Sequence, residues 1–131
     1  TLGELHRDTG RGGPMEWHKM GAGWSWTRKE GSEADHATEA REGWAEIKRR
    51  LAAETHGLYV LDEFTYPMAW GWLDVDDVVD TLGSRPGHQH VVITGRRCPE
   101  PILDLADLVT EMKKIKHPFD AGQKGQRGIE W

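Results

Sequence analysis

Cysteine is nearly absent from this sequence, because Cys98 is the only one among 131 residues. A single cysteine excludes an intrachain disulfide framework and a metal site of the CxxC type, and it agrees with a reducing compartment. We therefore expect a cytoplasmic protein. Two interpretations of Cys98 stay open: a reactive thiol whose pKa is depressed beside Arg97, or an unreactive side chain, which is commoner for a lone cysteine without an identified base.

Long apolar runs and an excess of positive charge are absent as well. No run approaches the roughly 18 apolar residues of a membrane span, and no charged-then-apolar leader is visible. The formal net charge of −5 argues against a broad basic surface for nucleic acid, although cations can still cluster around an anion. We expect one soluble α/β domain over residues 1–131 that binds neither membranes nor nucleic acid, with flexible ends at 1–14 and 116–131.

The most informative segment present is 58–66, where an apolar run ends in two adjacent carboxylates, Asp62 and Glu63. Ligands of open α/β sheets bind outside the carboxyl ends of the strands, so acids there can reach a metal or a phosphate, as in a Walker B strand. A second apolar run, 90–94, is followed by a small turn residue and Arg96. The two runs predict a nucleotide-phosphate site. The alternatives are acids that merely cap a strand and an arginine paired with a nearby acid.

Hydrophobic periodicity along the chain predicts alternating strands and helices. The expected elements are, in order, a short strand at 15–20, a helix at about 33–54, a strand at 58–63, a helix at 74–82, a strand at 90–94, a helix at 99–106 and a strand at 107–115. This alternation, with right-handed crossovers, implies a mainly parallel sheet flanked by helices.

Tryptophan is abundant, with seven copies, but most of them need no functional explanation. Trp44 belongs to the apolar stripe of the first long helix and is expected in the core, whereas Trp70 and Trp72 are expected to cover a helix edge. His88 and His90 could share one strand face, but no third ligand stands at a telling spacing. We therefore expect these histidines to be structural or exposed.

Four segments together resemble the ATP:corrinoid adenosyltransferases of cobalamin biosynthesis and salvage. They are Gly-Trp-Ser-Trp at 23–26, Leu-Asp-Glu-Phe-Thr-Tyr at 61–66, Val-Ile-Thr-Gly-Arg at 92–96 and Lys-His-Pro-Phe-Asp-Ala-Gly at 116–122. The Asp-Glu strand alone is weak evidence, but the tryptophan loop and the tail are specific in combination. The resemblance covers 15–131. It implies a RecA-like P-loop NTPase fold, usually a homodimer, that transfers the 5′-deoxyadenosyl group of ATP to the Co(I) form of a corrinoid and releases triphosphate. A reduced flavin or flavodoxin-like protein would be the reductant.

One motif of that family is missing, since no G-x-x-x-x-G-K-[ST] phosphate loop occurs in the sequence. The backbone N–H groups of that loop normally hold the phosphates. Because the sequence starts at Thr1 rather than at a methionine, we expect the N-terminal strand, the phosphate loop, its helix and the next strand, roughly 30 residues or more, to lie upstream. A degenerate homologue is the alternative.

The resemblance also assigns roles to individual side chains. Co(I) is itself the nucleophile that attacks the ribose C5′, so no residue need act as nucleophile or general base. The implied contacts are Glu63 with Asp62 for Mg²⁺ or Mn²⁺, Arg96 for the triphosphate or a corrinoid carboxamide, Lys124 for the triphosphate, and Trp24 and Trp26 for the lower face of the corrin. Core packing remains the alternative for the two tryptophans, and a solvated C-terminus the alternative for the lysine.

Three functions from different classes therefore stay in view. The first is the adenosyltransferase, with ATP and a reduced corrinoid as substrates. The second is a non-enzymatic corrinoid-binding or delivery module, which needs no phosphate loop. The third is a P-loop ATPase or switch protein, in which the acids and Arg96 serve phosphate hydrolysis or sensing.

Overall fold

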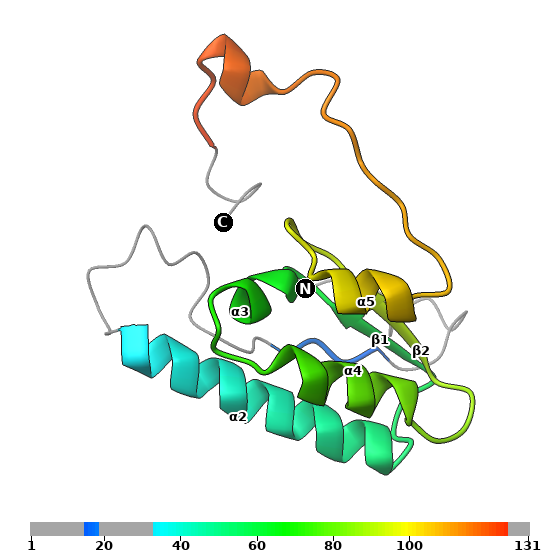
Figure 1. Ribbon diagram of the computed structural model, residues 1–131. Helices are drawn as coiled ribbons and strands as arrows, with labels where there is room; N and C mark the ends of the chain where they lie inside the picture. Colours follow the sequence, from blue (N-terminus) through cyan, green and yellow to red (C-terminus); the bar gives the residue numbers. More distant parts are fainter. Residues whose placement is uncertain (1–14, 19–32, 126–131) are drawn as a thin grey trace.

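The computed structural model describes residues 15–18 and 33–125, and Trp24 and Trp26 lie outside these ranges. The elements are α2 (Glu33–Ala52), β1 (Leu58–Leu61), α3 (Thr65–Ala69), α4 (Val75–Gly83), β2 (His90–Ile93), α5 (Glu100–Leu105) and a short 3-10 helix, η2 (Pro118–Ala121). The two strands pair in parallel, with Leu58 opposite His90 and Leu61 opposite Ile93 (Figure 1). The expected α/β class and the parallel pairing are confirmed.

Local signals explain where the two longest helices form. Helix α2 carries acids in its first turn and Arg49 and Arg50 in its last, which complements the helix dipole. Helix α4 begins after Asp74, whose carboxylate accepts a hydrogen bond from the Asp76 N–H at 3.0 Å. The predicted helices at 33–54, 74–82 and 99–106 are confirmed, with their ends shifted by one or two residues.

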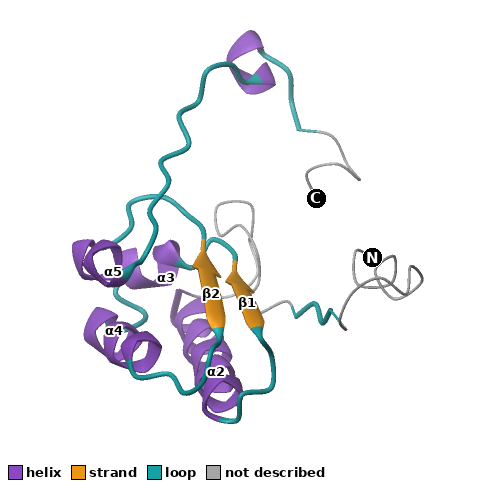
Figure 2. Ribbon diagram, turned by 90° about the vertical axis from the view of Figure 1, so that its right-hand side faces the viewer, coloured by secondary structure: helices purple, strands orange, loops and turns teal. Residues whose placement is uncertain are grey.

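Helices gather on one side of the two strands, as Figure 2 shows. Tyr59 and Leu61 of β1 are buried on that side against α2 and α4, in a core that also includes Trp44. The other face of the sheet carries Leu58 and Val60, which are 57% and 60% exposed. Within the described ranges, therefore, only one face of the sheet is covered.

The strand predicted at 107–115 is wrong. This segment is an extended stretch without strand pairing that leaves the domain after α5, and its apolar side chains face solvent, with Leu108 84% and Met112 93% exposed. A strand needs a partner edge for its backbone groups, and none of the described strands lies beside it. The alternating pattern reports which face is apolar but cannot report whether that partner is present.

Two further differences concern short elements. Residues 15–18 form no strand, so the described part of the strand predicted at 15–20 is also wrong. Helix α3 was not predicted from the sequence. It begins at Thr65, two residues after Glu63, and contains Pro67. A proline in the first turn of a helix lacks an N–H that would have no intrahelical partner anyway, so Pro67 does not prevent the helix.

Candidate functional site

The carboxyl ends of β1 and β2 meet at one edge of the sheet, which we call the strand-exit edge. The Thr94 N–H donates to the Leu61 carbonyl at 3.1 Å, which extends the ladder just past both strands. Asp62 and Glu63 follow β1 at this edge, and Arg96 follows β2. The prediction that the carboxylates and the guanidinium lie on the same edge is therefore confirmed.

Threonine hydroxyls tie the two strand exits together. The Thr94 Oγ1 donates to the Asp62 Oδ1 at 2.5 Å and accepts from the Glu63 N–H at 2.9 Å. The Thr65 Oγ1 donates to the Arg96 carbonyl at 2.8 Å. Sequence reasoning missed both threonines, although each stands within three residues of a predicted ligand. The signal that could have found them is a hydroxyl residue beside each strand end.

The side chains at this edge are open to solvent. Asp62, Glu63 and Arg96 are all exposed, and the described ion pairs include none between Arg96 and a carboxylate. The alternative in which Arg96 is held by a neighbouring acid therefore has no support within the described structure. An exposed arginine on the same edge as two exposed carboxylates can meet a ligand that combines an anion with a cation.

The backbone at the strand-exit edge is strained. Glu63 and Arg97 have positive φ values of 56° and 54°, in the left-handed region that non-glycine residues seldom adopt. Gly95, two residues before Arg97 in the segment after β2, has a φ of 144°. Each non-glycine residue in the left-handed region lowers the free energy of unfolding by about 1–3 kcal/mol, and such residues are found most often at functional sites. Glu63 and Arg97 therefore form tight turns soon after the two strands, although Glu54, after α2, also has a positive φ of 50°.

The acid pair fits one kind of metal ion. In the described part of the chain no group of three or more His, Cys, Asp or Glu side chains could hold a metal. Mg²⁺ is usually bound by one or two carboxylates together with substrate phosphates and water. Asp62 and Glu63 therefore fit a divalent cation that is shared with a phosphate ligand, and they do not fit a cation held in an all-protein cage.

Lys124 has no described contact with this edge. It follows η2 on the exposed C-terminal segment, and no described contact joins it to Arg96. The Lys-His-Pro-Phe-Asp-Ala-Gly motif instead forms a local turn. The His117 Nδ1 accepts from the Phe119 N–H at 3.1 Å, and Lys114 pairs with Asp120 at 2.7 Å. The described structure does not bring the two predicted phosphate cations together.

Three tryptophans inside the described ranges pack against other side chains, whereas Trp17 is 64% exposed. Trp44 is buried and its Nε1 donates to the Asp77 Oδ2 at 2.7 Å, so its prediction as a core residue is confirmed. Trp72 stacks on His36 of α2 with ring centroids 6.4 Å apart, and Trp70 lies against Trp72 at 4.6 Å. The expectation that this pair covers a helix edge is confirmed.

The remaining candidates do not form a second reactive site. Cys98 is half-buried beside the core, and burial raises the pKa of its thiol, so the interpretation as a depressed-pKa nucleophile is wrong. His88 and His90 are exposed, as expected.

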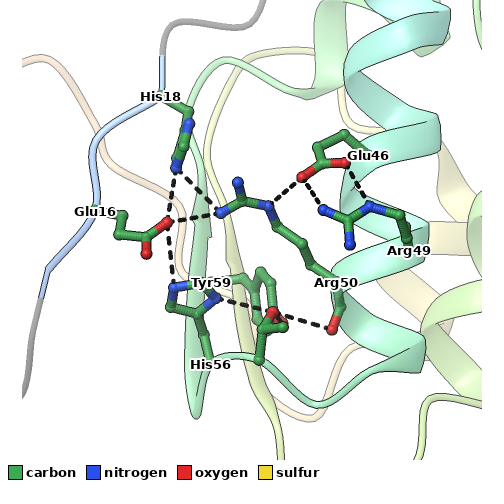
Figure 3. Close-up of polar contacts among 8 residues, drawn as sticks. Glu16, His18, Glu46, Arg49, Arg50, His56 and Tyr59 are labelled. Atoms are coloured by element: carbon green, nitrogen blue, oxygen red, sulfur yellow. Dashed lines mark hydrogen bonds and ion pairs between the residues drawn. The ribbon is translucent and has the colours of Figure 1, made fainter.

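A separate polar cluster ties residues 15–18 to the end of α2 (Figure 3). The Glu16 Oε2 lies 2.9 Å from the His18 Nε2, 2.9 Å from the Arg50 Nη1 and 3.6 Å from the His56 Nε2. Hydrogen bonds from His18 and then Arg50 lower the pKa of Glu16 to about 2. His56 precedes β1, so the cluster lies at the amino end of that strand, away from Asp62.

Ligands of open parallel α/β sheets bind outside the carboxyl ends of the strands, which is the edge where Asp62, Glu63 and Arg96 stand. In the part of the chain that the structure describes, no helix is long and apolar enough to span a membrane. The family described as ATP:corrinoid adenosyltransferase BtuR/CobO/CobP matches residues 2–131, and the chain belongs to this family. The resemblance noted from the sequence motifs is confirmed.

Curated relatives agree with this assignment. Over 117 residues the chain is 44% identical to the corrinoid adenosyltransferase CobA of Salmonella typhimurium, 43% to the corrinoid adenosyltransferase of Escherichia coli K12 and 38% to that of Pseudomonas aeruginosa. These matches cover 89% of this chain but only 59%, 59% and 57% of the respective relatives. The chain thus spans less than two thirds of the length of these proteins.

Proposed function

We propose that the protein containing this chain transfers the 5′-deoxyadenosyl group of ATP to the Co(I) form of a corrinoid, in cobalamin biosynthesis or salvage. The observation that carries the proposal is the placement of Asp62, Glu63 and Arg96 at one strand-exit edge in a chain of the adenosyltransferase family. The Co(I) electron pair forms the bond to the ribose C5′, and the C5′–O bond breaks with release of triphosphate.

The chemistry asks the protein for position and charge rather than for a nucleophile or base. Glu63, with Asp62 beside it, would hold Mg²⁺ or Mn²⁺ at the strand-exit edge. A divalent cation there would neutralise charge that develops on the leaving triphosphate. Arg96 supplies a permanent positive charge on the same edge, and the absence of a described ion-pair partner leaves it available to the phosphates.

Three more residues complete the proposed site from sequence resemblance alone. Lys124 would reach the triphosphate from the C-terminal segment, and Trp24 and Trp26 would pack under the corrin. An indole has apolar area that can exclude water or an axial base from cobalt, but it carries no charge for a triphosphate. We therefore assign the tryptophans to the corrinoid and the cations to ATP.

The rest of the architecture is proposed on the same basis. A RecA-like P-loop fold would add strands and a phosphate loop to the small parallel sheet, and the exposed apolar side chains of Leu58, Val60 and Val92 support further covering elements. Homodimerisation, a reduced flavin or flavodoxin-like reductant and a cytoplasmic location complete the proposal. The single cysteine supports the last of these.

The test uses the full-length protein with chemically generated cob(I)alamin and MgATP. We expect formation of the adenosylated corrinoid, followed by its absorbance, together with one triphosphate released per transfer. Release of orthophosphate without transfer would support the ATPase or switch function. Corrinoid binding with neither reaction would support the binding module, and either result would overturn the proposal.

A further inference from the structure

The two strand exits hold each other through threonine hydroxyls in a reciprocal arrangement. Thr94 follows β2, yet its hydroxyl bonds to the two residues that follow β1. Thr65 belongs to the segment after β1, yet its hydroxyl bonds to the carbonyl of Arg96, which follows β2. Each exit turn is therefore fixed by a side chain from the other exit, and we call the pair the threonine brace.

The Thr94 hydroxyl both donates and accepts a hydrogen bond in this brace. Its one O–H points to the Asp62 Oδ1, and its oxygen accepts the Glu63 N–H. The first contact fixes the direction of the Asp62 carboxylate. The second holds the backbone of Glu63, a residue with a φ of 56°, so the brace stabilises a conformation that Glu63 would otherwise seldom adopt.

Thr65 fixes the backbone of the turn that follows β2. Its side chain is 2% exposed, and its hydroxyl is 2.8 Å from the Arg96 carbonyl. A Cβ added at Gly95 would lie 2.0 Å from the Thr65 Oγ1, so the hydroxyl reaches this carbonyl only because residue 95 is glycine. The neighbouring Arg97 has a left-handed φ of 54°.

We infer that Thr94 and Thr65 are positioning residues for ligand binding at the strand-exit edge: Thr94 orients the Asp62 carboxylate and holds the backbone of Glu63 for a divalent cation, and Thr65 holds the backbone of Arg96 for the phosphates of ATP. The inference rests on the proposed function, because it takes the ligands from there. The Thr94 hydroxyl bonds to the Asp62 carboxylate and to the Glu63 N–H, whereas no described hydrogen bond joins the Thr65 side chain to either residue. The two threonines therefore act on different parts of the ligand.

The experiment measures two affinities separately in the full-length protein. Mn²⁺ binding at saturating ATP is followed by the electron paramagnetic resonance signal of free Mn²⁺. ATP binding without metal is followed by equilibrium dialysis in a chelator. The variants are Thr94→Val, which keeps the shape and removes the hydroxyl, and Thr94→Ser, which keeps the hydroxyl. Thr110→Val, on the exposed extended segment after α5, is the matched control.

We expect Thr94→Val to weaken Mn²⁺ binding about tenfold while metal-free ATP binding stays within about twofold of the wild type, as for a group that orients metal ligands. Thr94→Ser and Thr110→Val should both resemble the wild type. Thr65→Val should show the converse pattern, with metal-free ATP binding weakened and Mn²⁺ binding at saturating ATP nearly kept. A purely structural role would weaken both affinities together in each variant.

Several outcomes overturn the inference. Unchanged Mn²⁺ binding in Thr94→Val, or equal loss of both affinities, removes the positioning role while leaving the proposed function intact, provided that the wild type still transfers the adenosyl group. If Thr94→Val fails to fold, Thr94→Ala and Thr94→Ser decide, and equal Mn²⁺ binding by these two contradicts the brace. If the wild type neither binds MnATP nor transfers the adenosyl group, the proposed function is wrong, and the inference about the threonine brace is wrong with it because it takes the metal ion and ATP from that function.

Discussion

Glycine at position 95 meets two separate demands. Its φ of 144° lies in a range that other residues rarely adopt, and a Cβ there would lie 2.0 Å from the Thr65 Oγ1. We expect Gly95→Ala to lower the free energy of unfolding by about 3 kcal/mol, because the backbone strain at residue 95 and the clash with the buried Thr65 side chain both destabilise the fold. Urea unfolding followed by circular dichroism measures the change.

Two other glycines separate these contributions. Gly71 has a φ of 71° with no atom within 4 Å of an added Cβ, and Gly57 has neither a positive φ nor a close neighbour. Gly71→Ala should therefore cost only the backbone strain, about 1 kcal/mol, and Gly57→Ala should be near neutral. Equal losses at 95 and 71 would show that the contact with Thr65 is unimportant.

Glu63 is the carboxylate that we expect to dominate metal binding, because its side chain is exposed and has no described partner, whereas Asp62 is bonded to Thr94. Glu63→Gln should reduce Mn²⁺ affinity and adenosyl transfer by roughly 100-fold, since the loss removes a charged oxygen ligand. Asp62→Asn, which can still accept from Thr94, is the control and should lose less. Wild-type Mn²⁺ affinity in Glu63→Gln would favour the interpretation of the acids as a strand cap.

At the scale of elements, Asp77 joins α4 to α2. Its carboxylate lies 2.9 Å from the Lys48 Nζ and accepts from the Trp44 Nε1, and these contacts, Lys48 first, lower the pKa of Asp77. A lowered carboxyl pKa stabilises the fold above the unfolded-state pKa and loses that effect as the pH falls through the folded-state pKa. The packing of the two helices is therefore acid-sensitive.

We expect Asp77→Asn to lose about 0.5–1 kcal/mol of unfolding free energy at pH 7, a modest value because solvent screens the half-exposed pair. The difference from the wild type should shrink as the pH falls below the ordinary carboxyl pKa of 3.8 and through the lowered folded-state pKa of Asp77, where the wild-type carboxyl becomes protonated as well. Asp76→Asn changes a charge at the same helix start without a described contact to α2. If Asp76→Asn matches Asp77→Asn at every pH, the helix dipole and not the link to α2 explains the effect.

The Glu16 cluster connects another pair of elements, and its titration tests whether residues 15–18 stay attached to α2 in solution. The pKa of Glu16 is about 2, below its ordinary 4.5, chiefly because His18 and then Arg50 donate hydrogen bonds to it. Attachment should persist above pH 4.5 and weaken as the pH falls through about 2. Carboxyl ¹³C shifts measure this pKa directly.

Arg50→Gln and His18→Ala should each move the Glu16 pKa back toward 4.5, with His18→Ala having the larger effect. Arg49→Gln is the matched control, because Arg49 bonds to Glu46 and makes no described contact with Glu16. A wild-type Glu16 pKa near 4.5 would mean that the cluster does not form in solution.

At the scale of the whole molecule, the sheet described here has two strands and one covered face, and no phosphate loop motif occurs in the sequence. We expect residues 1–131 alone to bind MgATP weakly and a protein extended to the length of the curated relatives to bind it tightly, since loop N–H groups hold phosphates. Isothermal titration calorimetry on both proteins provides the comparison. Comparable affinities would contradict the need for an upstream phosphate loop.

Much of the fold followed from local patterns. The apolar stripe that includes Trp44 predicted helix α2 and its buried face, and the apolar runs before Asp62 and Arg96 predicted parallel strands with a shared edge. Such patterns succeed because burial within one helix or strand depends on residues only a few positions apart. The family assignment also came from the sequence, because its motifs are short and contiguous.

Only the tertiary structure decided the contacts between distant residues. The threonine brace joins positions 31 or 32 residues apart, and no local pattern records that Thr94 faces Asp62 or that Gly95 makes room for Thr65. For the segment at 107–115 the local pattern was misleading. Its alternation of apolar and polar residues suits a strand, but a strand also requires a neighbouring strand edge from elsewhere in the fold. Hydrogen bonding and close packing depend on what lies opposite a residue, and that is set by how the whole chain folds.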